Sequence, residues 1–351
     1  MRSVLRWAST LWLTASGAAF AELPRWLSDD QGEWTYNLVH ENDLVDAGHD
    51  RNYTSGVMIT ATSPPVDPQS PIWRPVWEAT KWVTGINDGL QVRREYSLSH
   101  LMFTPHDLTL NPPDPDDRPY AGMMLLSLGV IGAHQNEQRQ RFDTFNYTIA
   151  LIGSQSRADD IQTWLHEYQE GIIPQGWRTQ LPNDVVAGVS YQRTLRYPLT
   201  DDGPWGADWS VHWGGSLGYI QTNANAGLSA RVGFNLPNDF GLPRIAPSVP
   251  ASGFFEPDAD HGVYLFAGVQ RRYVWYDVTI DEAPAHAPAS IDREPWVSDG
   301  QIGWVAYWRK FHFGYTRVWR GRAFSTQQHE DSFGVWAGGF RTRFCLCLLD
   351  R

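Results

Sequence analysis

The sequence predicts an all-β protein, a transmembrane antiparallel β-barrel of about 12 strands with long loops and one short helix near residues 156–170. Three observations point to this fold: an N-terminal export signal, a series of segments with alternating apolar and polar side chains, and a high aromatic content. The chain contains 18 Trp, 14 Tyr and 15 Phe, yet its mean hydropathy is only -0.40. Outer-membrane barrels place Trp and Tyr in girdles at both membrane interfaces, which accounts for this combination.

The N-terminus has the three parts of a secretory signal peptide. Arg2 and Arg6 supply positive charge, residues 4–18 are mostly apolar, and the sequence Ala-Phe-Ala at 19–21 has the small-x-small form of a cleavage site. The apolar run is shorter than the roughly 20 residues of a spanning helix, which disfavours a retained membrane anchor. We therefore predict a signal peptide at 1–21 and one barrel domain at 22–351.

The alternation is clearest in residues 209–221, where Trp209, Val211 and Trp213 alternate with small or polar residues. Residues 228–236 repeat the pattern, and Thr-Asn-Ala-Asn at 222–225 is the predicted turn between them. Ten further segments read as strands: 33–41, 54–62, 93–103, 121–133, 142–152, 185–197, 262–276, 299–309, 311–319 and 333–344. A soluble sandwich would share the alternation, but several segments reach the ~9–11 residues that cross a bilayer at a tilt.

Between the predicted strands lie long irregular segments and one helical segment. Residues 63–82, 104–119, 235–257 and 281–295 are read as loops of a single domain. Ile161, Trp164, Leu165 and Tyr168 have helical spacing, and Ser156 with Asp159 is expected to cap the start of this helix. His166 lies on the helix outside the apolar stripe, either as a surface residue or as a proton acceptor.

Charge and cysteine content exclude some functions. The net charge of -11 argues against a nucleic-acid partner, which would require a basic face. The two cysteines, Cys345 and Cys347, are separated by one residue, so they cannot form a structural disulfide framework and their spacing is poor for zinc.

Two polar clusters are candidates for chemistry. Residues 39–57 combine Asn42, Asp43 and further acidic residues, whose oxygen donors suit a hard cation such as Ca²⁺, although the spacing does not match an EF-hand and turn chemistry explains the same residues. Arg118 follows two aspartates and opens a predicted strand. It could hold a phosphate or carboxylate in a fork, or pair with the neighbouring Asp116 or Asp117.

Three blocks in this order, "ENDLVDAGHDRNYTSGV", "DDRPYAGMMLLSLG" and "IQTWLHEYQEGIIPQGWRTQL", resemble the lipid A 3'-O-deacylase (LpxR-type) family of Gram-negative outer membranes. The segment "GVQRRYVWYDVTID" at 268–281 is similar too. The resemblance implies a twelve-stranded barrel in the bacterial outer membrane and hydrolysis of the ester-linked 3' acyloxyacyl group of lipid A, with Ca²⁺ as cofactor. Residues 22–351 would then form the deacylase domain.

The resemblance also implies the site residues. The family positions match Asn42, Asp43, Thr54 and His166 in this sequence, and Glu170 is the best candidate for an acidic residue that follows the family histidine. In this reading His166 accepts a proton from water, Asp43 ligates or positions Ca²⁺, and the cation stabilises the oxyanion.

Substrate contacts and partners follow from the same reading. Trp164, next to His166 in sequence, is expected to receive acyl chains of lipid A or lipopolysaccharide in the outer leaflet. We expect a membrane-embedded monomer.

Two other functions remain open from the sequence. One is a non-catalytic outer-membrane barrel, a porin or a structural protein. The other is an outer-membrane phospholipase, in which Ser55 paired with His166 would be the nucleophile.

Overall fold

A computed structural model describes residues 32–43, 52–67, 73–84, 90–135, 140–200, 203–245, 253–282 and 290–343. The predicted signal peptide at 1–21, Cys345 and Cys347 lie outside these residues.

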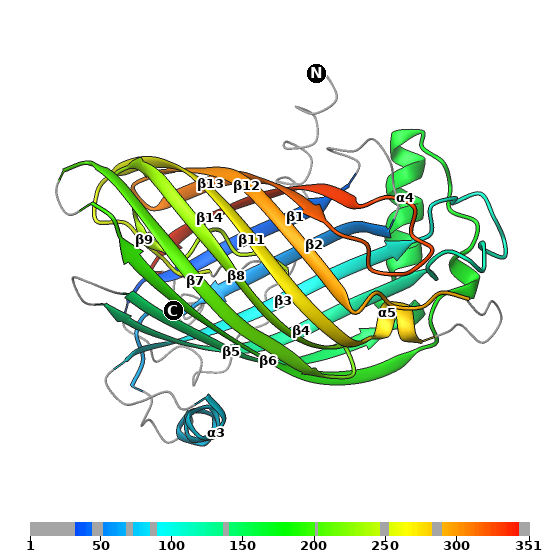
Figure 1. Ribbon diagram of the computed structural model, residues 1–351, viewed down its shortest axis with the longest axis horizontal. Coiled ribbons are helices and arrows are strands. Elements are labelled where there is room, and N and C mark those ends of the chain that lie inside the picture. Colours follow the sequence, from blue (N-terminus) through cyan, green and yellow to red (C-terminus); the bar gives the residue numbers. More distant parts are fainter. Residues whose placement is uncertain are drawn as a thin grey trace, which may run out of the picture.

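In the described part of the chain, twelve antiparallel strands close into a barrel, as the sequence predicted (Figure 1). The strands are β1 (Trp34–Asn42), β2 (Asn52–Thr62), β3 (Gln91–Thr104), β4 (Ala121–Gln135), β5 (Gln140–Ile152), β6 (Asp184–Pro198), β7 (Trp205–Gly218), β8 (Gln221–Phe234), β11 (His261–Asp277), β12 (Trp296–Trp308), β13 (Phe311–Arg320) and β14 (Asp331–Thr342). Each of the twelve predicted segments corresponds to one of these strands.

Pairing of the first strand with the last closes the barrel. β1 pairs with β14 from Trp34↔Thr342 to Asn42↔Gly334. Because the number of strands is even, β1 begins and β14 ends at the same end of the barrel, called here the terminal end. The opposite end is called the distal end.

The period-2 pattern separates an apolar outer wall from a polar interior, as expected. On β8, Leu228 and Val232 are exposed on the outer wall, whereas Arg231 is buried in the interior. Exposed aromatic residues gather at the two ends of the wall: Trp205, Trp308, Phe311 and Phe340 at the terminal end, and Tyr219, Trp275, Trp296 and Trp319 at the distal end. Exposed aliphatic residues lie between these groups, which is the arrangement of a membrane-facing surface.

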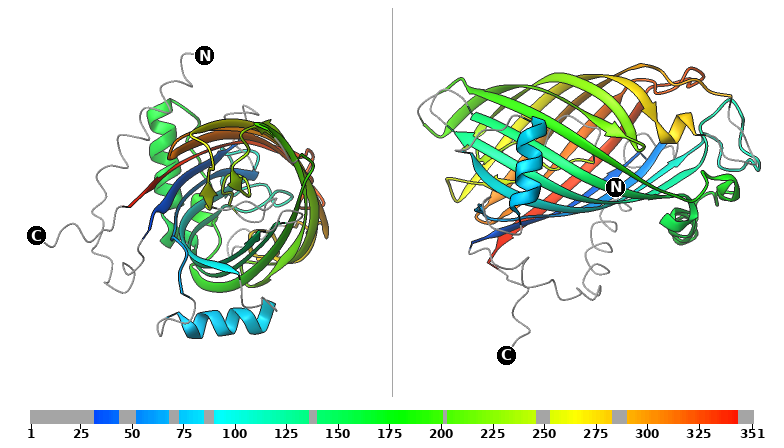
Figure 2. Two further views of the ribbon diagram at one scale, coloured as in Figure 1. Left: turned by 90° about the vertical axis from the view of Figure 1, so that its left-hand side faces the viewer. Right: turned by 90° about the horizontal axis from the view of Figure 1, so that it is seen from below.

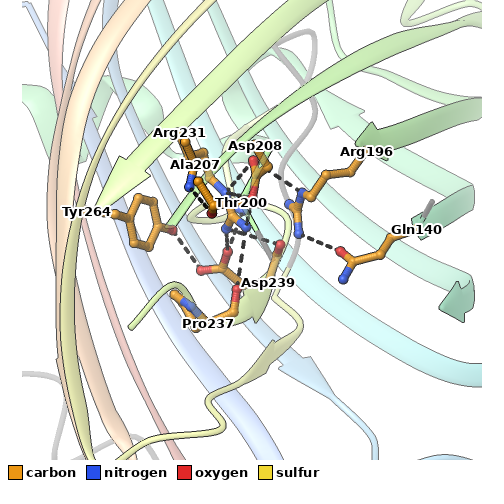
Figure 3. A network of polar contacts seen from close by, with 10 residues as sticks. Gln140, Arg196, Thr200, Ala207, Asp208, Arg231, Pro237, Asp239 and Tyr264 are labelled. Carbon is orange, nitrogen blue, oxygen red and sulfur yellow. Dashed lines mark hydrogen bonds and ion pairs between the residues drawn. The ribbon is translucent and has the colours of Figure 1, made fainter. Parts of the chain in front are cut away.

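The connection between β8 and β11 folds into the barrel. It contains β9 (Asn238–Asp239) and β10 (Phe255–Glu256), a two-stranded sheet seen inside the barrel in the end-on view of Figure 2. Arg231 of the wall contacts Asp208 and Asp239, and the Tyr264 hydroxyl donates to Asp239 at 2.7 Å (Figure 3). Ion pairs and packed side chains therefore fill the interior at the terminal end of the barrel.

The turn predicted at 222–225 was wrong. β7 ends at Gly218, whose φ of 141° is readily available only to glycine, and β8 begins at Gln221. Residues 222–225 belong to β8, where Asn223 donates to the Ser216 hydroxyl at 2.7 Å. Asparagine favours turns, but the polar interior of this barrel also accepts it within a strand.

The loop predicted at 63–82 contains a helix, α3 (Arg74–Thr84), that the sequence analysis missed. Pro75 lies in its first turn, where a missing N–H costs no hydrogen bond. A short helix, α5 (Val278–Asp281), lies between the end of β11 and the loop predicted at 281–295. No helix among the described residues is long and apolar enough to cross a membrane.

The predicted helix is α4 (Ala158–Gln169), preceded by a 3₁₀ turn at Gly153–Ser156. Its predicted cap was wrong: Arg157 occupies the N-cap in the left-handed conformation, with φ of 60°, and no side chain caps the helix. The Ser156 hydroxyl donates instead to the Gly153 carbonyl at 2.7 Å, because the 3₁₀ turn ends there.

Candidate active site

The distal ends of β1 and β2 bring three of the predicted site residues together. Asn42 is the last residue of β1 and pairs with Ser55 of β2. Its side-chain amide donates to the Thr54 carbonyl at 3.2 Å, and the Asp43 backbone N–H points to the same carbonyl at 3.4 Å. The Asp43 side chain is only 4% exposed. The Asn42 carboxamide and the Asp43 backbone thus meet at the Thr54 carbonyl.

A β-bulge shapes the position of Thr54. The register between β2 and β3 shifts between Tyr53 and Ser55, so Thr54 has no partner of its own on β3. Such bulges re-aim side chains and are common beside active sites. Here the Thr54 hydroxyl meets the hydroxyl of Thr104, the last residue of β3, at 2.7 Å, and both threonines are buried.

The two threonines lie on the outer wall of the barrel. Residues that alternate along a strand share one face, and on β3 that outer face includes Leu98, which is 48% exposed, and continues through His100 and Met102 to Thr104. The inner face carries Leu101, which belongs to the core of the barrel. Thr104 and its partner Thr54 are therefore buried beneath something outside the barrel.

The segment that covers this wall is the connection between β5 and β6, which contains α4. Figures 1 and 2 show α4 outside the barrel at its distal end. The His100 imidazole bonds the Ser156 carbonyl at 3.0 Å through Nε2, and Met102 packs in one apolar cluster with Ala158. On β4, a Cβ at Gly122 would lie 2.4 Å from that of Ala158, so glycine permits this close approach.

α4 turns its polar side toward the wall. Ala158, Gln162 and His166 follow one another at intervals of four residues and are all buried, with His166 9% exposed. The apolar stripe used to predict the helix faces away from the barrel: Ile161, Trp164 and Tyr168 are 40%, 60% and 69% exposed. His166 is thus a buried residue on the wall-facing side and not a surface histidine.

The loop after α4 fixes the orientation of the His166 ring. Nδ1 of His166 lies 2.5 Å from the carbonyl oxygen of Ile172. Because a carbonyl oxygen can only accept, Nδ1 carries the hydrogen, and Nε2 is then the acceptor nitrogen of the neutral imidazole. The same loop returns the Gly171 N–H to the His166 carbonyl at 2.8 Å, which closes the helix.

The chain after this loop folds back and holds α4 in place. The Trp177 indole N–H donates to the buried Gln162 side chain at 2.7 Å, and the Trp177 ring packs on Tyr120 with centroids 4.8 Å apart. A Cβ at Gly176 would lie 2.4 Å from the Tyr120 ring, so this contact also needs glycine. The chain after α4 therefore ties Gln162 of the helix to Tyr120, at the end of the β3–β4 connection.

Glu170 and Trp164 occupy the exposed parts of the same segment. Glu170 forms the C-cap of α4 in the left-handed conformation, with φ of 56°, and its side chain is exposed. The Trp164 ring stacks on Tyr168 on the outward face, at a centroid distance of 6.2 Å. Trp164 is next to His166 in sequence but points to the opposite side of the helix.

Arg118 lies inside the mouth of the barrel and is not brought to the outer-wall group. Its guanidinium stacks over Phe103, an inward residue of β3, at 4.4 Å and donates to the Thr279 hydroxyl at 2.8 Å. Burial lowers the pKa of the Arg118 guanidinium, and the nearby carboxylates of Asp277 and Asp331 oppose this shift. Arg118 thus joins the polar network that closes the interior at the distal end.

The donor set at the end of β1 is compatible with a hard cation. It contains the buried Asp43 carboxylate and the Asn42 carboxamide, and oxygen donors of these kinds are the ligands that Ca²⁺ takes in proteins. Within the described ranges, no group of three or more His, Cys, Asp or Glu side chains could hold a metal ion. A cation here would take Asp43 as its carboxylate, with carbonyl, water or lipid oxygens as further ligands.

Three residues of this site were not predicted from the sequence. Thr104 was assigned to a loop because the strand pattern fades at 103, although it continues the outward face of β3. Gln162 precedes His166 by one helical turn, and this spacing was the available signal. The Ile172 carbonyl could not have been found, because a backbone acceptor leaves no mark in the side-chain pattern.

Comparison with known proteins identifies the chain's relatives. A family model described as "Outer membrane protein LpxR" matches residues 7–341. The structure is similar to LpxR from Salmonella typhimurium, with a TM-score of 0.65 at 15% identity over 88% of this chain and 99% of that one. The β domain of the Bordetella autotransporter BrkA aligns with a TM-score of 0.42 at 8% identity, over 89% of this chain and 99% of that chain. No functionally curated protein sequence matches. This protein of the outer membrane belongs to the LpxR family.

Proposed function

We propose that this protein is a hydrolase that removes the 3'-linked acyloxyacyl group of lipid A in the outer leaflet. One observation carries the proposal: His166 is buried on the wall-facing side of a helix that lies outside the barrel. A site between α4 and the outer wall lies on the lipid-facing side of the barrel, so a lipid ester could reach it without passing through the barrel interior.

The assignment to the outer leaflet rests on the connections at the two barrel ends. Outer-membrane barrels have longer extracellular loops and shorter periplasmic turns. The distal end carries the long connections at 105–120, 153–183 and 278–295. At the terminal end, four residues separate β4 from β5 and two separate β12 from β13, while its two long connections carry α3 and the internal β9–β10 sheet. We therefore assign the distal end, with α4, to the extracellular side.

In the proposed reaction, His166 acts as the general base. Nε2 accepts a proton from a water molecule as its oxygen attacks the ester carbonyl, and the imidazolium then returns that proton to the departing oxygen. The Ile172 carbonyl keeps the Nδ1 hydrogen in place throughout, so the ring presents the same nitrogen in both steps. Asn42 and Thr54 would orient the water or the acyl carbonyl.

Asp43 would hold a Ca²⁺ ion, with the Asn42 carboxamide beside it. When bound, the cation would supply Lewis-acid stabilisation of negative charge on the ester carbonyl oxygen. Trp164 and Tyr168, on the outward face of α4, would lie among the acyl chains of the leaflet. Glu170 has no role in this proposal beyond ending the helix.

Mass spectrometry of lipid A tests the proposal. The protein is produced in a Gram-negative host, and lipid A is extracted from outer membranes kept with Ca²⁺ or with a chelator. We expect loss of one acyloxyacyl unit with Ca²⁺ and an unchanged mass after chelation. An unchanged lipid A mass under both conditions, with a correctly folded barrel present, would contradict the proposed activity.

A conducting porin is a poorer alternative. The described interior is occupied by β9, β10 and ion pairs, and it holds a cavity of about 40 Å³ beside Arg196 and Arg231. That volume accommodates only a few water molecules. An open channel in planar bilayers, together with unchanged lipid A, would favour the porin.

A serine phospholipase remains the second candidate because Ser55 is buried on the same outer wall, opposite Asn42. Ser55→Ala separates the two mechanisms. Retained lipid A deacylation in this variant indicates water as the nucleophile, whereas lost activity in a folded barrel indicates a serine acyl-enzyme.

A further inference from the structure

The second helix on the outer wall, α3, lies at the terminal end of the barrel. Figure 1 views α3 end-on beside the barrel, and the end-on view of the barrel in Figure 2 shows α3 from the side, so its axis runs across the barrel axis. A helix in this position is parallel to the plane of a membrane that the barrel spans.

α3 is held to the wall by an apolar contact. Trp77 is 3% exposed and packs in one cluster with Val92 of β3 and Val130 of β4. The Thr80 hydroxyl is 3.2 Å from the hydroxyl of Tyr147 on β5. These contacts fix which faces of the helix point away from the barrel.

The remaining surface of α3 is divided into an apolar face and a charged flank. With about 100° per residue, Pro75, Ala79 and Trp82 lie on the side opposite Trp77. All three are exposed, and Trp82 is 87% exposed. Arg74, Glu78 and Lys81 share one flank between the two faces, where Lys81 pairs with Glu78 at 3.8 Å. An apolar face with charges along its edge is the pattern of a helix in a membrane interface.

A row of aromatic rings leads along the outer wall to this helix. Successive rings are 5.6 to 6.4 Å apart in the order Phe340, Tyr36, Trp34, Tyr96 and Trp73. Trp73 directly precedes α3, and the Arg94 guanidinium lies 4.5 Å from its ring centre. Farther along the wall, Val92 and Val130 occupy the surface, and α3 covers them. α3 therefore continues the row where the strands themselves carry aliphatic residues.

We propose that α3 docks into the interface of the periplasmic leaflet, with Trp82 and Ala79 among glycerophospholipid chains and the charged flank at the headgroups. The helix completes the periplasmic aromatic girdle over β3–β5. Interfacial Trp side chains stabilise this position because the ring is apolar and its N–H still reaches polar groups. This inference depends on the barrel spanning the outer membrane and is independent of the proposed deacylase activity.

Site-specific quenching tests the docking. In a full-length chain with Cys345 and Cys347 replaced by serine, Trp82→Cys and Glu78→Cys are each labelled with a bimane fluorophore. The folded barrel is reconstituted into vesicles of phosphatidylethanolamine and phosphatidylglycerol, with brominated acyl chains or with iodide in the buffer. Heat-modifiable electrophoretic mobility confirms that each barrel is folded, and Ala79→Cys provides a second position on the apolar face.

We expect the label at 82 to be quenched by brominated chains and protected from iodide, and the label at 78 to be quenched more strongly by iodide. Equal access of iodide to both positions, without quenching by brominated lipid at 82, would overturn the proposal. Protection at 82 that appears only at high protein-to-lipid ratio would assign this face to a second copy of the chain and would also overturn it.

Discussion

The two helices on the outer wall, α3 and α4, face the barrel in opposite ways. α3 packs Trp77 against Val92 and Val130, so an apolar surface meets an apolar surface. α4 turns Gln162 and His166 toward the wall, while Ile161, Trp164 and Tyr168 face outward. Both helices have an exposed apolar face, as expected beside lipid, but α4 buries an imidazole and a carboxamide against the wall, whereas the polar group that α3 buries there is the Thr80 hydroxyl.

The difference shows how a membrane-facing wall can hold either a stabilising contact or a reaction site. Burial of polar groups is costly unless hydrogen bonds satisfy them, and around α4 the bonds from Trp177 to Gln162 and from His166 to Ile172 meet this cost. Apolar packing needs no such compensating hydrogen bonds, and α3 is held to the wall mainly in this way. We therefore expect changes beneath α4 to affect activity and changes beneath α3 to affect stability.

The largest expected effect is from His166→Ala. Loss of the proposed general base should lower the deacylation rate by ~10²–10⁴-fold, because such proton transfer contributes about this much to catalysis. The unfolding midpoint should change little, since the barrel pairing does not involve α4. Mass spectrometry of lipid A and denaturant unfolding measure the two effects. His261→Ala, an exposed histidine at the terminal end, is the matched control; equal activity in both variants would remove His166 from the mechanism.

Trp77→Ala should weaken the attachment of α3 and leave the deacylation activity unchanged. Truncation of a buried Trp costs roughly 3–5 kcal/mol, so α3 should detach from the wall while the barrel stays folded. Trypsin should then cleave after Lys81 in detergent, whereas deacylation per folded molecule is retained. Trp82→Ala removes an exposed ring from the same helix and should remain resistant. Loss of activity with Trp77→Ala would mean that the two helices are coupled, and would contradict the expectation that α3 affects stability alone.

Gly122→Val tests the contact that places α4. The new Cβ would lie 2.3 Å from the Ser156 hydroxyl and 2.4 Å from the Ala158 Cβ, so the start of α4 must move away from β4. A shift of about 1 Å at a reaction site can cost on the order of 10²-fold in rate. Gly300→Ala, where nothing lies within 4 Å of the new Cβ, is the control. A deacylation assay that finds the two variants equally active would show that the contact does not position His166.

The smallest expected effect is from Thr104→Val, which keeps the side-chain shape and removes the hydrogen bond to Thr54. One neutral hydrogen bond contributes roughly 1 kcal/mol, so the rate should fall by up to about tenfold. Thr148→Val breaks a similar hydroxyl–hydroxyl bond on the inner face of the barrel, between Thr148 and Ser127 at 2.8 Å. Equal rates for these two variants would indicate that Thr54 needs no support from β3.

Much of the fold could be predicted because period-2 alternation is a local signal. Each strand of the barrel was recognisable from its own residues, including the one at Trp209, and the even strand count suggested closure. The hairpin turn was misplaced because Asn223 and Asn225 favour turns locally, whereas the polar interior accepts them in a strand. α3 was missed because Pro and Trp residues obscure a helix whose stability comes from packing on the wall.

In the candidate site, too, some residues could be predicted from the sequence and others depended on the tertiary structure. Asn42, Asp43 and Thr54 adjoin in the structure because they lie at the facing ends of two neighbouring strands, which the sequence order already implied. His166 comes from a connection more than 100 residues later, so its place against the wall depends on long-range contacts at Gly122 and Trp177. The orientation of α4 was open as well, because hydrophobic periodicity identifies an apolar face but not whether it meets protein or lipid.

The sequence by itself determined the class of fold, the strands and the polar groups at the ends of β1 and β2, because these depend on residue types and short-range order. The tertiary structure alone decided that the polar face of α4 turns inward and that the Ile172 carbonyl orients His166. It also decided that α3 lies on the outer wall. A helix on the outer wall of a membrane protein has the barrel on one side and lipid on the other, and both can be apolar. Only the position of the neighbouring strands decides which face of the helix meets protein and which meets lipid.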